Sequence, residues 1–223
     1  MAGLLLSVGL TGCGGDSDAS GGAKDSVSTM PSGDVAIEPG TCLVPEAAGW
    51  SVVDFTVTFP DGWRARDAHQ FDRNSDEPDE IGILPFVVDD IYADACEGDR
   101  GAVTEVGPSA QDLVEALLAQ PGPAKSDPVE AILGGYPATR IDLRVPKRLQ
   151  SQDCFLGPGT GVQLWLTKPD KYLVLDAEGI VSVYVVDVNG QRQVFTTQYR
   201  PAHTSEEERA ELQQVLDSIR IQT

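Results

Sequence analysis

Apolar and polar residues alternate along several segments of the chain. This pattern predicts β-strands, because successive side chains of a strand point to opposite faces. In the clearest case, Phe55 to Phe59, apolar residues alternate with threonine up to a turn at 60–62, and Trp63 follows as a predicted core residue. Further strands are predicted over 81–88, where Pro85 indicates an edge or a bulge, and over 129–133, 138–145, 162–167 and 172–175.

A hairpin is predicted near the C-terminus, where Asn189 and Gly190 separate two apolar runs, 181–188 and 192–199. Asn-Gly favours the type I′ turn, whose twist matches that of the strands it joins. A two-residue loop also sets the register: it pairs Asp187 with Arg192, Val185 with Val194 and Tyr184 with Phe195. This register puts apolar residues on both faces of the sheet, so both faces need cover.

Two helices are predicted to supply that cover. Ser109 and Asp112 indicate the start of one helix, and Pro121 its end; Ser205 and Glu208 form a capping box for the other. The second helix has an apolar face of Leu212, Val215, Leu216 and Ile219. We therefore expect an α+β fold, a mainly antiparallel sheet covered by helices on both faces.

The N-terminus has the form of a bacterial lipoprotein signal. An apolar run from Leu4 leads into Leu10-Thr11-Gly12-Cys13, which predicts acylation of Cys13, although no Lys or Arg precedes it and the start codon is expected further upstream. The run is too short to cross a membrane. The predicted organisation is a signal peptide over 1–12, a lipid-anchored flexible linker over 13–48, rich in Gly and Ser, and one globular domain over 49–223.

The formal net charge of −19 narrows the possible partners. A nucleic-acid-binding protein needs a basic surface, so nucleic acid is excluded as a partner, and contact with anionic lipid headgroups is disfavoured. The expected location is the extracytoplasmic face of the cell membrane, with the lipid anchor as the membrane contact.

The chain has four cysteines, and acylation of Cys13 leaves three for an oxidising compartment. Cys96 and Cys154 both lie beside acidic loop residues within the predicted domain, and we expect them to form a disulfide. Cys42 would then be a free thiol or pair between molecules; pairing of Cys42 with Cys96 or Cys154 is the alternative.

The acidic segment from Asp72 offers a weak metal site. Asp72, Asn74 and Asp76 match the first three ligand positions of a calcium loop, but a glutamate and an isoleucine stand where that loop needs its glycine and its bidentate Glu. We expect a solvated loop and no metal site. His69 and His203 are expected in exposed loops, which leaves no ligand set for zinc or copper, and no cofactor is expected.

Large aromatic residues are the other candidates for a binding surface. Trp50, Trp63, Trp165 and Tyr172 could line a groove for a glycan or an apolar ligand, but core packing is the stronger expectation. Trp165 and Leu164 lie on opposite sides of one predicted strand, so one side must pack or stay exposed as a binding surface.

Several segments together resemble a known family. The stretch 54–63, the segment Gly134-Gly135-Tyr136-Pro137-Ala138, the hairpin and the closing helix resemble actinobacterial surface lipoproteins of unknown function. Their architecture is similar to the PsbP-like α/β/α sandwich. The resemblance covers about Val52 to Ile221. It implies a fold whose members mostly bind or assist assembly, and it carries over no catalytic residue.

The function expected from these observations is a non-catalytic, lipid-anchored domain that binds an unknown envelope protein or cell-wall component. No nucleophile elbow is present, so no serine hydrolase is predicted. Two alternatives remain: an envelope hydrolase with paired carboxylates, which leave no mark in a sequence, and a divalent-cation sensor.

Overall fold

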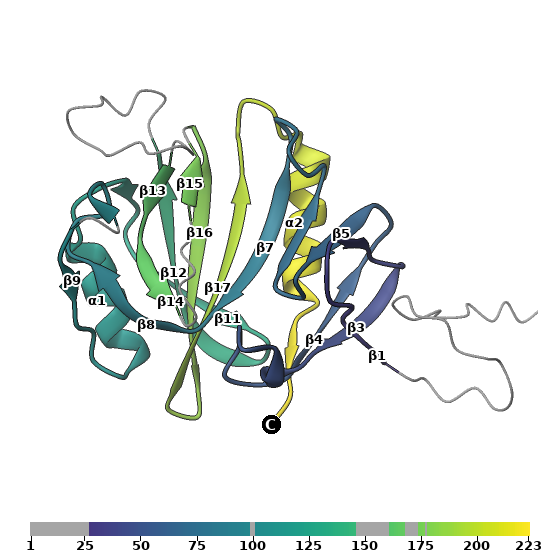
Figure 1. Cartoon of the computed structure of the whole chain (residues 1–223), viewed down its shortest axis with the longest axis horizontal. Helices are drawn as coiled ribbons and strands as arrows, with labels where there is room; N and C mark the ends of the chain where they lie inside the picture. Colours follow the sequence, from purple (N-terminus) through teal and green to yellow (C-terminus); the bar gives the residue numbers. More distant parts are fainter. Residues whose placement is uncertain (1–26, 99–100, 146–160, 168–173, 177) are drawn as a thin grey trace, which may run out of the picture.

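A computed structural model describes residues 27–98, 101–145, 161–167, 174–176 and 178–223. The structure is mostly β-sheet, with 45% strand and 15% helix. Its largest element is a nine-stranded sheet that runs through the whole domain (Figure 1). In spatial order its strands are β10 (Ala124–Lys125), β12 (Tyr136–Arg144), β16 (Ile180–Val188), β17 (Gln191–Tyr199), β7 (Ile81–Phe86), β6 (Gln70–Arg73), β5 (Trp63–Arg66) and β2 (Val35–Ala36), with β11 (Val129–Leu133) paired to β12.

The hairpin β16–β17 has the predicted register. Asp187 lies opposite Arg192, Val185 opposite Val194 and Tyr184 opposite Phe195. Asn189 and Gly190 both have positive φ, +54° and +86°, as a type I′ turn requires. A single local dipeptide therefore fixes the pairing of two nine-residue strands at the centre of the sheet.

Each face of the large sheet packs against its own hydrophobic core. On one face, Tyr184 and Val186 join Trp63, Phe55 and the apolar side of α2 (Glu206–Asp217). This face is also covered by a second sheet of four strands. Their order is β1 (Ser28–Thr29), β3 (Gly40–Val44), β4 (Phe55–Phe59) and β18 (Arg220–Ile221).

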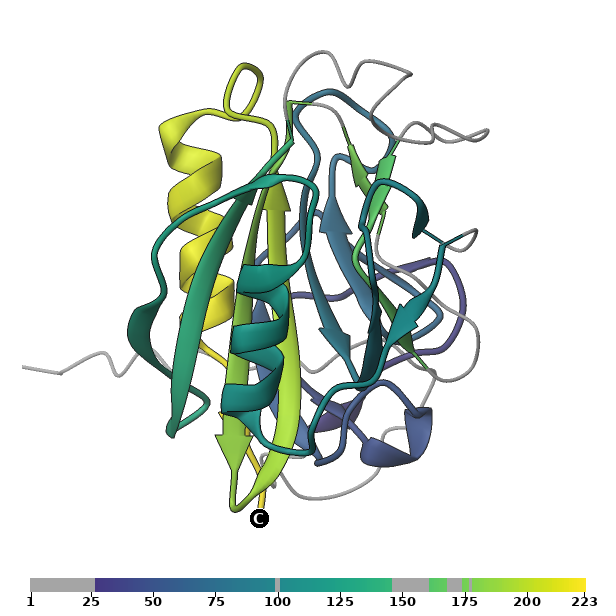
Figure 2. The same cartoon turned by 90° about the vertical axis from the view of Figure 1, so that its left-hand side faces the viewer.

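The opposite face packs against α1 (Ala110–Ala119) and three short strands near it. Val183 and Val185 of β16 meet Leu113 and Leu117 of α1, together with Trp165. Figure 2 shows α1 lying across β16 and β17. The other cover on this face comes from β8 (Val88–Tyr92), β9 (Val103–Thr104) and β14 (Trp165–Thr167), with the pair β13 (Gly161–Gln163) and β15 (Val174–Asp176) nearby.

The predicted fold class is wrong in what covers the sheet. Apolar residues do lie on both faces of β16 and β17, and both faces are covered. Each face, however, receives one helix and a group of strands, so the molecule is not a PsbP-like α/β/α sandwich with helical layers. Two-sided apolar strands require burial, but they do not specify whether a helix or a strand supplies it.

The predicted boundary of the linker at Ala48 is also wrong. From Ser28 onward the chain adds strands to both sheets, and the 3-10 turn η1 (Glu46–Ala48) follows β3. Met30, Cys42 and Val44 are buried in the core beside β4. The strands in this segment are short, and their partners lie tens of residues away in sequence, so the local composition resembled that of a linker.

Other local predictions are confirmed. Ser109 and Ser205 both form complete capping boxes, with Asp112 and Glu208 as the reciprocal partners. Trp63 is fully buried. The prediction that Pro85 marks an edge or a bulge is not met in that form, because β7 lies between β17 and β6 in the sheet. Pro85 lies beyond Ile83, the last residue that pairs with β6, so its missing N–H removes no bond to β6.

Candidate functional site

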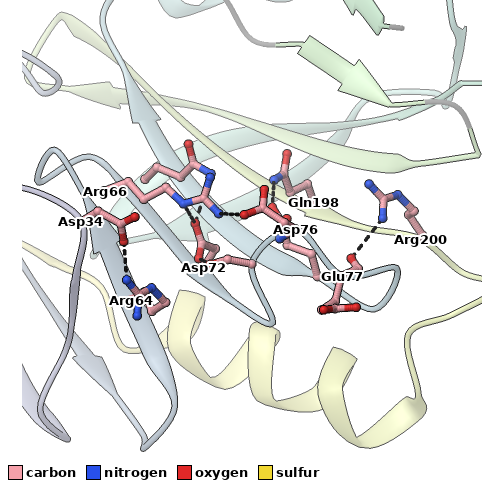
Figure 3. Close-up of polar contacts among 11 residues, drawn as sticks. Asp34, Arg64, Arg66, Asp72, Asp76, Glu77, Gln198 and Arg200 are labelled. Carbon is pink, nitrogen blue, oxygen red and sulfur yellow. Dashed lines mark hydrogen bonds and ion pairs between the residues drawn. The ribbon is translucent and has the colours of Figure 1, made fainter. Parts of the chain in front are cut away.

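The richest polar cluster surrounds Asp72 on β6, next to the turn that follows this strand (Figure 3). Its carboxylate is completely buried and lies 3.1 Å from Nε of Arg66. The Nε hydrogen is not directed at this oxygen, so the contact is an ion pair without a hydrogen bond. Gln70 donates from Nε2 at 3.1 Å and Ser75 donates from its hydroxyl. A buried carboxylate with this many partners is satisfied within the protein.

The calcium-loop candidates do not converge on a common point. Asp72 faces Arg66, the amide nitrogen of Asn74 donates to Asp79 and Glu208, and the carboxylate of Asp76 is 87% exposed. Searched across the described residues alone, no group of three His, Cys, Asp or Glu side chains is placed to hold a metal ion. The sequence spacing matched a calcium loop, but the side chains have taken other partners.

Glu80 is the carboxylate of this cluster that departs from ordinary behaviour. Partial burial raises the pKa of Glu80 above its ordinary value, and the nearby charge of Asp72 adds to the rise. Its oxygens accept from the backbone N–H of Asp76 and from Nε2 of Gln198. The cavity that it lines with Arg200 and others has a volume of about 30 Å³, which is room for one water molecule and not for a substrate.

The two histidines differ in environment. His203 is exposed, as predicted, but His69 is buried and its ring stacks on Trp50 with centroids 3.5 Å apart. The prediction of an exposed loop for His69 is wrong, because an aromatic partner from a distant segment covers the ring.

The aromatic groove suggested by the sequence is not formed by its tryptophans. Trp50, Trp63 and Trp165 are all buried. Leu164 and Trp165 both pack into the core beneath α1, while Leu166 and Thr167 of the same segment line an open pocket of about 630 Å³. Tyr172 lies outside the described residues.

Cys42 and Cys96 are both disulfide-bonded. The predicted free thiol at Cys42 is therefore wrong, and the pairing of Cys42 with Cys96 or Cys154 stays a prediction. Cys13 and Cys154 lie outside the described residues, so acylation of Cys13 and the Cys96–Cys154 pairing remain predictions.

An open groove, which we call the β11 groove, lies on the α1 face of the large sheet. It is beside the first turn of α1, where the strands continue beyond the start of the helix. It has a volume of about 760 Å³. Pro137 and Thr139 of β12 and Val185 and Asp187 of β16 form its floor, on the same side of the strands as the core under α1. The first turn of α1 forms one wall and Glu130 and Ile132 of β11 form the other.

Ile132 makes this groove unusual. Its side chain is 79% exposed, against at most 48% for the other exposed large apolar residues in the described part of the chain. Exposed apolar side chains at the rim of a groove are a common feature of binding sites. Two carboxylates, Glu130 and Asp187, also line the groove, and within the described ranges neither belongs to an ion pair.

The α1 wall of the groove is held in place by polar contacts. Ser109 and Asp112 cap the helix, and the hydrogen bonds from Ser109 hold the pKa of Asp112 below its ordinary value. The guanidinium of Arg192 donates to four backbone carbonyls, among them that of Ser109 at 3.3 Å and that of Val88 at 2.6 Å. These contacts join the start of α1 to β17 and β8, so the wall is built from rigid elements.

The sequence reasoning predicted β11 correctly over 129–133 but did not identify the groove. Alternation within β11 indicated that Glu130 and Ile132 share a face. It could not show that α1 stops short of this face, because the position of a helix over a sheet depends on contacts between distant segments.

Comparisons with known proteins do not name a family. No family model and no curated protein matches the chain. Among solved structures, one from Bacteroides thetaiotaomicron VPI-5482 is similar with a TM-score of 0.36 and 14% sequence identity, over 82% of this chain. The chain spans about half of that structure's length, 48%.

Proposed function

We propose that this chain is a non-catalytic binding domain, held at the extracytoplasmic face of a membrane by lipid on Cys13, that binds an envelope protein or cell-wall component in the β11 groove. One observation carries the proposal: Ile132, 79% exposed, stands at the rim of an open groove of about 760 Å³. A side chain of this kind gains most from burial against a partner.

The polar cluster around Asp72 does not offer the hydrolase alternative a site. A carboxylate pair needs a concave site that admits a substrate and a water. Asp72 is enclosed by Arg66, Gln70 and Ser75, and the cavity beside Glu80 holds about one water. The cation-sensor alternative finds little support, because Asp72 and Asp76 both contact the guanidinium of Arg66, and the side chain of Asn74 donates to Asp79.

The location rests on the sequence. In the described residues, no helix is long and apolar enough to cross a membrane. Since β1 begins at Ser28, a tether between Cys13 and this strand would have roughly 14 residues and, if flexible, a reach of about 20 Å. Replacement Cys13→Ala is expected to release the protein from the membrane fraction.

The cysteines constrain that location. If Cys96 pairs with Cys154, the partner of Cys42 within the chain is Cys13, whose sulfur then cannot carry lipid. Mass spectrometry of the N-terminal peptide of the intact protein distinguishes the two states. A diacylglyceryl group on Cys13 supports the proposed anchor, and a Cys13–Cys42 crosslink contradicts it.

Site-specific photo-crosslinking in the native envelope tests the groove. A photoreactive amino acid is placed in the intact protein at Ile132 or Gln111 in the groove, or at Val103 on β9, which is exposed but does not line the groove. The proposal expects a defined crosslinked product from Ile132 and Gln111 that is absent from Val103. Equal products from all three positions would contradict it.

A further inference from the structure

The backbone of β11 has an unpaired edge with a fixed register. The turn between β11 and β12 consists of Gly134 and Gly135, whose φ angles of +64° and +95° are those of a type I′ turn. The residues that flank such a two-residue turn, Leu133 and Tyr136, form a hydrogen-bonded pair, and such pairs alternate along antiparallel strands with pairs that are not bonded.

Glu130 and Ile132 therefore form non-bonded pairs with β12, opposite Thr139 and Pro137. Pro137 fits this register, since it has no N–H to donate and lies just before Ala138, the first residue that pairs with β16. The N–H and C=O groups of Glu130 and Ile132 point away from β12, and no other strand in the described ranges pairs with β11.

The same two residues direct their side chains into the groove. A strand added along β11 would thus meet the free backbone groups of Glu130 and Ile132, with every second side chain on the groove face. Opposite Ile132 an apolar side chain would complete the contact. Opposite Glu130, a basic side chain would pair with this carboxylate and lie near Asp187.

We propose that the groove takes an extended segment of a second protein, which adds antiparallel to β11 with an apolar residue opposite Ile132 and a Lys or Arg opposite Glu130. This inference rests on the proposed function and names the class of partner. A second copy of the chain fits poorly, because each copy has a net charge of −19 and brings a carboxylate to the same edge.

A synthetic peptide tests the proposal with the full chain as receptor. The peptide is capped and has seven residues, with threonine at alternate positions and two valines followed by one lysine on the other face. Fluorescence anisotropy measures its binding. Methylation of the backbone nitrogens opposite Ile132 and Glu130 is expected to weaken binding at least about tenfold, because those N–H groups face β11. The nitrogen of the residue between them faces solvent, so its methylation is expected to have little effect.

Variants of the protein test the side-chain part of the proposal. Ile132→Asp is expected to weaken peptide binding at least about tenfold, and Glu130→Gln about two- to fivefold, with a smaller loss at high salt. Val103→Asp on the exposed strand β9 and Glu207→Gln on α2 are the matched controls and are expected to bind like wild type.

Two results would overturn the inference. One is that the peptide fails to bind at millimolar concentration, or binds regardless of which nitrogen is methylated. The other is that the chain sediments as a dimer that Ile132→Asp dissociates, which would make a second copy the occupant. If the first result is found while Ile132 still crosslinks specifically in the envelope, strand addition is wrong and the groove remains a binding site.

Discussion

The Asp72 cluster and the β11 groove lie on the same sheet, yet they differ in whether their side chains have partners within the protein. In the Asp72 cluster, the buried carboxylate of Asp72 is contacted by Arg66, Gln70 and Ser75. At the groove, an apolar side chain and two carboxylates are left in solvent, and a strand edge is left unpaired.

In a strongly acidic protein, the segment richest in carboxylates is therefore not always the best candidate for a binding site. A concentration of carboxylates draws attention to the segment from Asp72, but groups that satisfy one another have little left to offer a ligand. Burial of exposed apolar surface and hydrogen bonding of unpaired backbone groups both favour the binding of a partner, and β11 has both features.

The largest effect is expected from Asp72→Asn. Removal of the buried charge leaves Arg66 with only the exposed carboxylate of Asp76 as an ion-pair partner and is expected to lower the free energy of unfolding by about 3 kcal/mol. Asp76→Asn is the matched control, since Asp76 also contacts Arg66 but is 87% exposed, and it is expected to cost less than about 0.5 kcal/mol. Urea denaturation measures both. Equal losses for the two variants would mean that Asp72 does not hold the cluster together.

A smaller loss is expected from Ser109→Ala, which removes the cap of α1 at the groove wall. The free energy of unfolding should fall by about 1 kcal/mol. Ser205→Ala removes the equivalent cap of α2 and should cost a similar amount. Only Ser109→Ala is expected to weaken binding in the groove. If both variants weaken it equally, the effect comes from general stability and not from the wall.

The pH dependence of stability is expected to change in Glu80→Gln. Since burial raises the folded-state pKa of Glu80 above its ordinary 4.5, its contribution to stability is present below about pH 4.5 and lost as pH rises through the raised value. Removal of this carboxyl should therefore make the variant more stable, relative to wild type, at pH 7 than at pH 4. Urea denaturation at the two pH values measures this, and the opposite trend would show that the ionised form is favoured in the fold.

The smallest effect on stability is expected from Ile132→Asp. Because the side chain is 79% exposed, its replacement should change the free energy of unfolding by no more than about 0.5 kcal/mol, even though it removes the centre of the groove rim. Thermal unfolding measures the change. A fall in the free energy of unfolding of more than about 2 kcal/mol would show that Ile132 packs within the domain and is not available to a partner.

Local signals predicted local structure well. Asn189-Gly190 gave the register of the central hairpin, and Ser109 and Ser205 gave the starts of both helices, because each signal acts within a few residues. Trp63 was correctly placed in the core. These features need no knowledge of distant segments.

Features that depend on distant partners were missed. Cys42 and Val44 belong to a strand because β4 pairs with them, and His69 is buried because Trp50 covers it. The groove also depends on distant segments. Glu130 and Ile132 were assigned to a strand, but their exposure depends on where α1 begins over the sheet. A single sequence holds no direct record of these contacts.

Amide hydrogen exchange along β11 in the intact protein tests the central claim most directly, since it reports on each backbone N–H of the edge. In the free protein, the amides of Glu130 and Ile132 should exchange fast, while those of Val129 and Ala131, bonded to β12, are protected. Addition of the basic, apolar peptide should protect Glu130 and Ile132. Protection of these two amides before any peptide is added, or no change after it, would contradict the account.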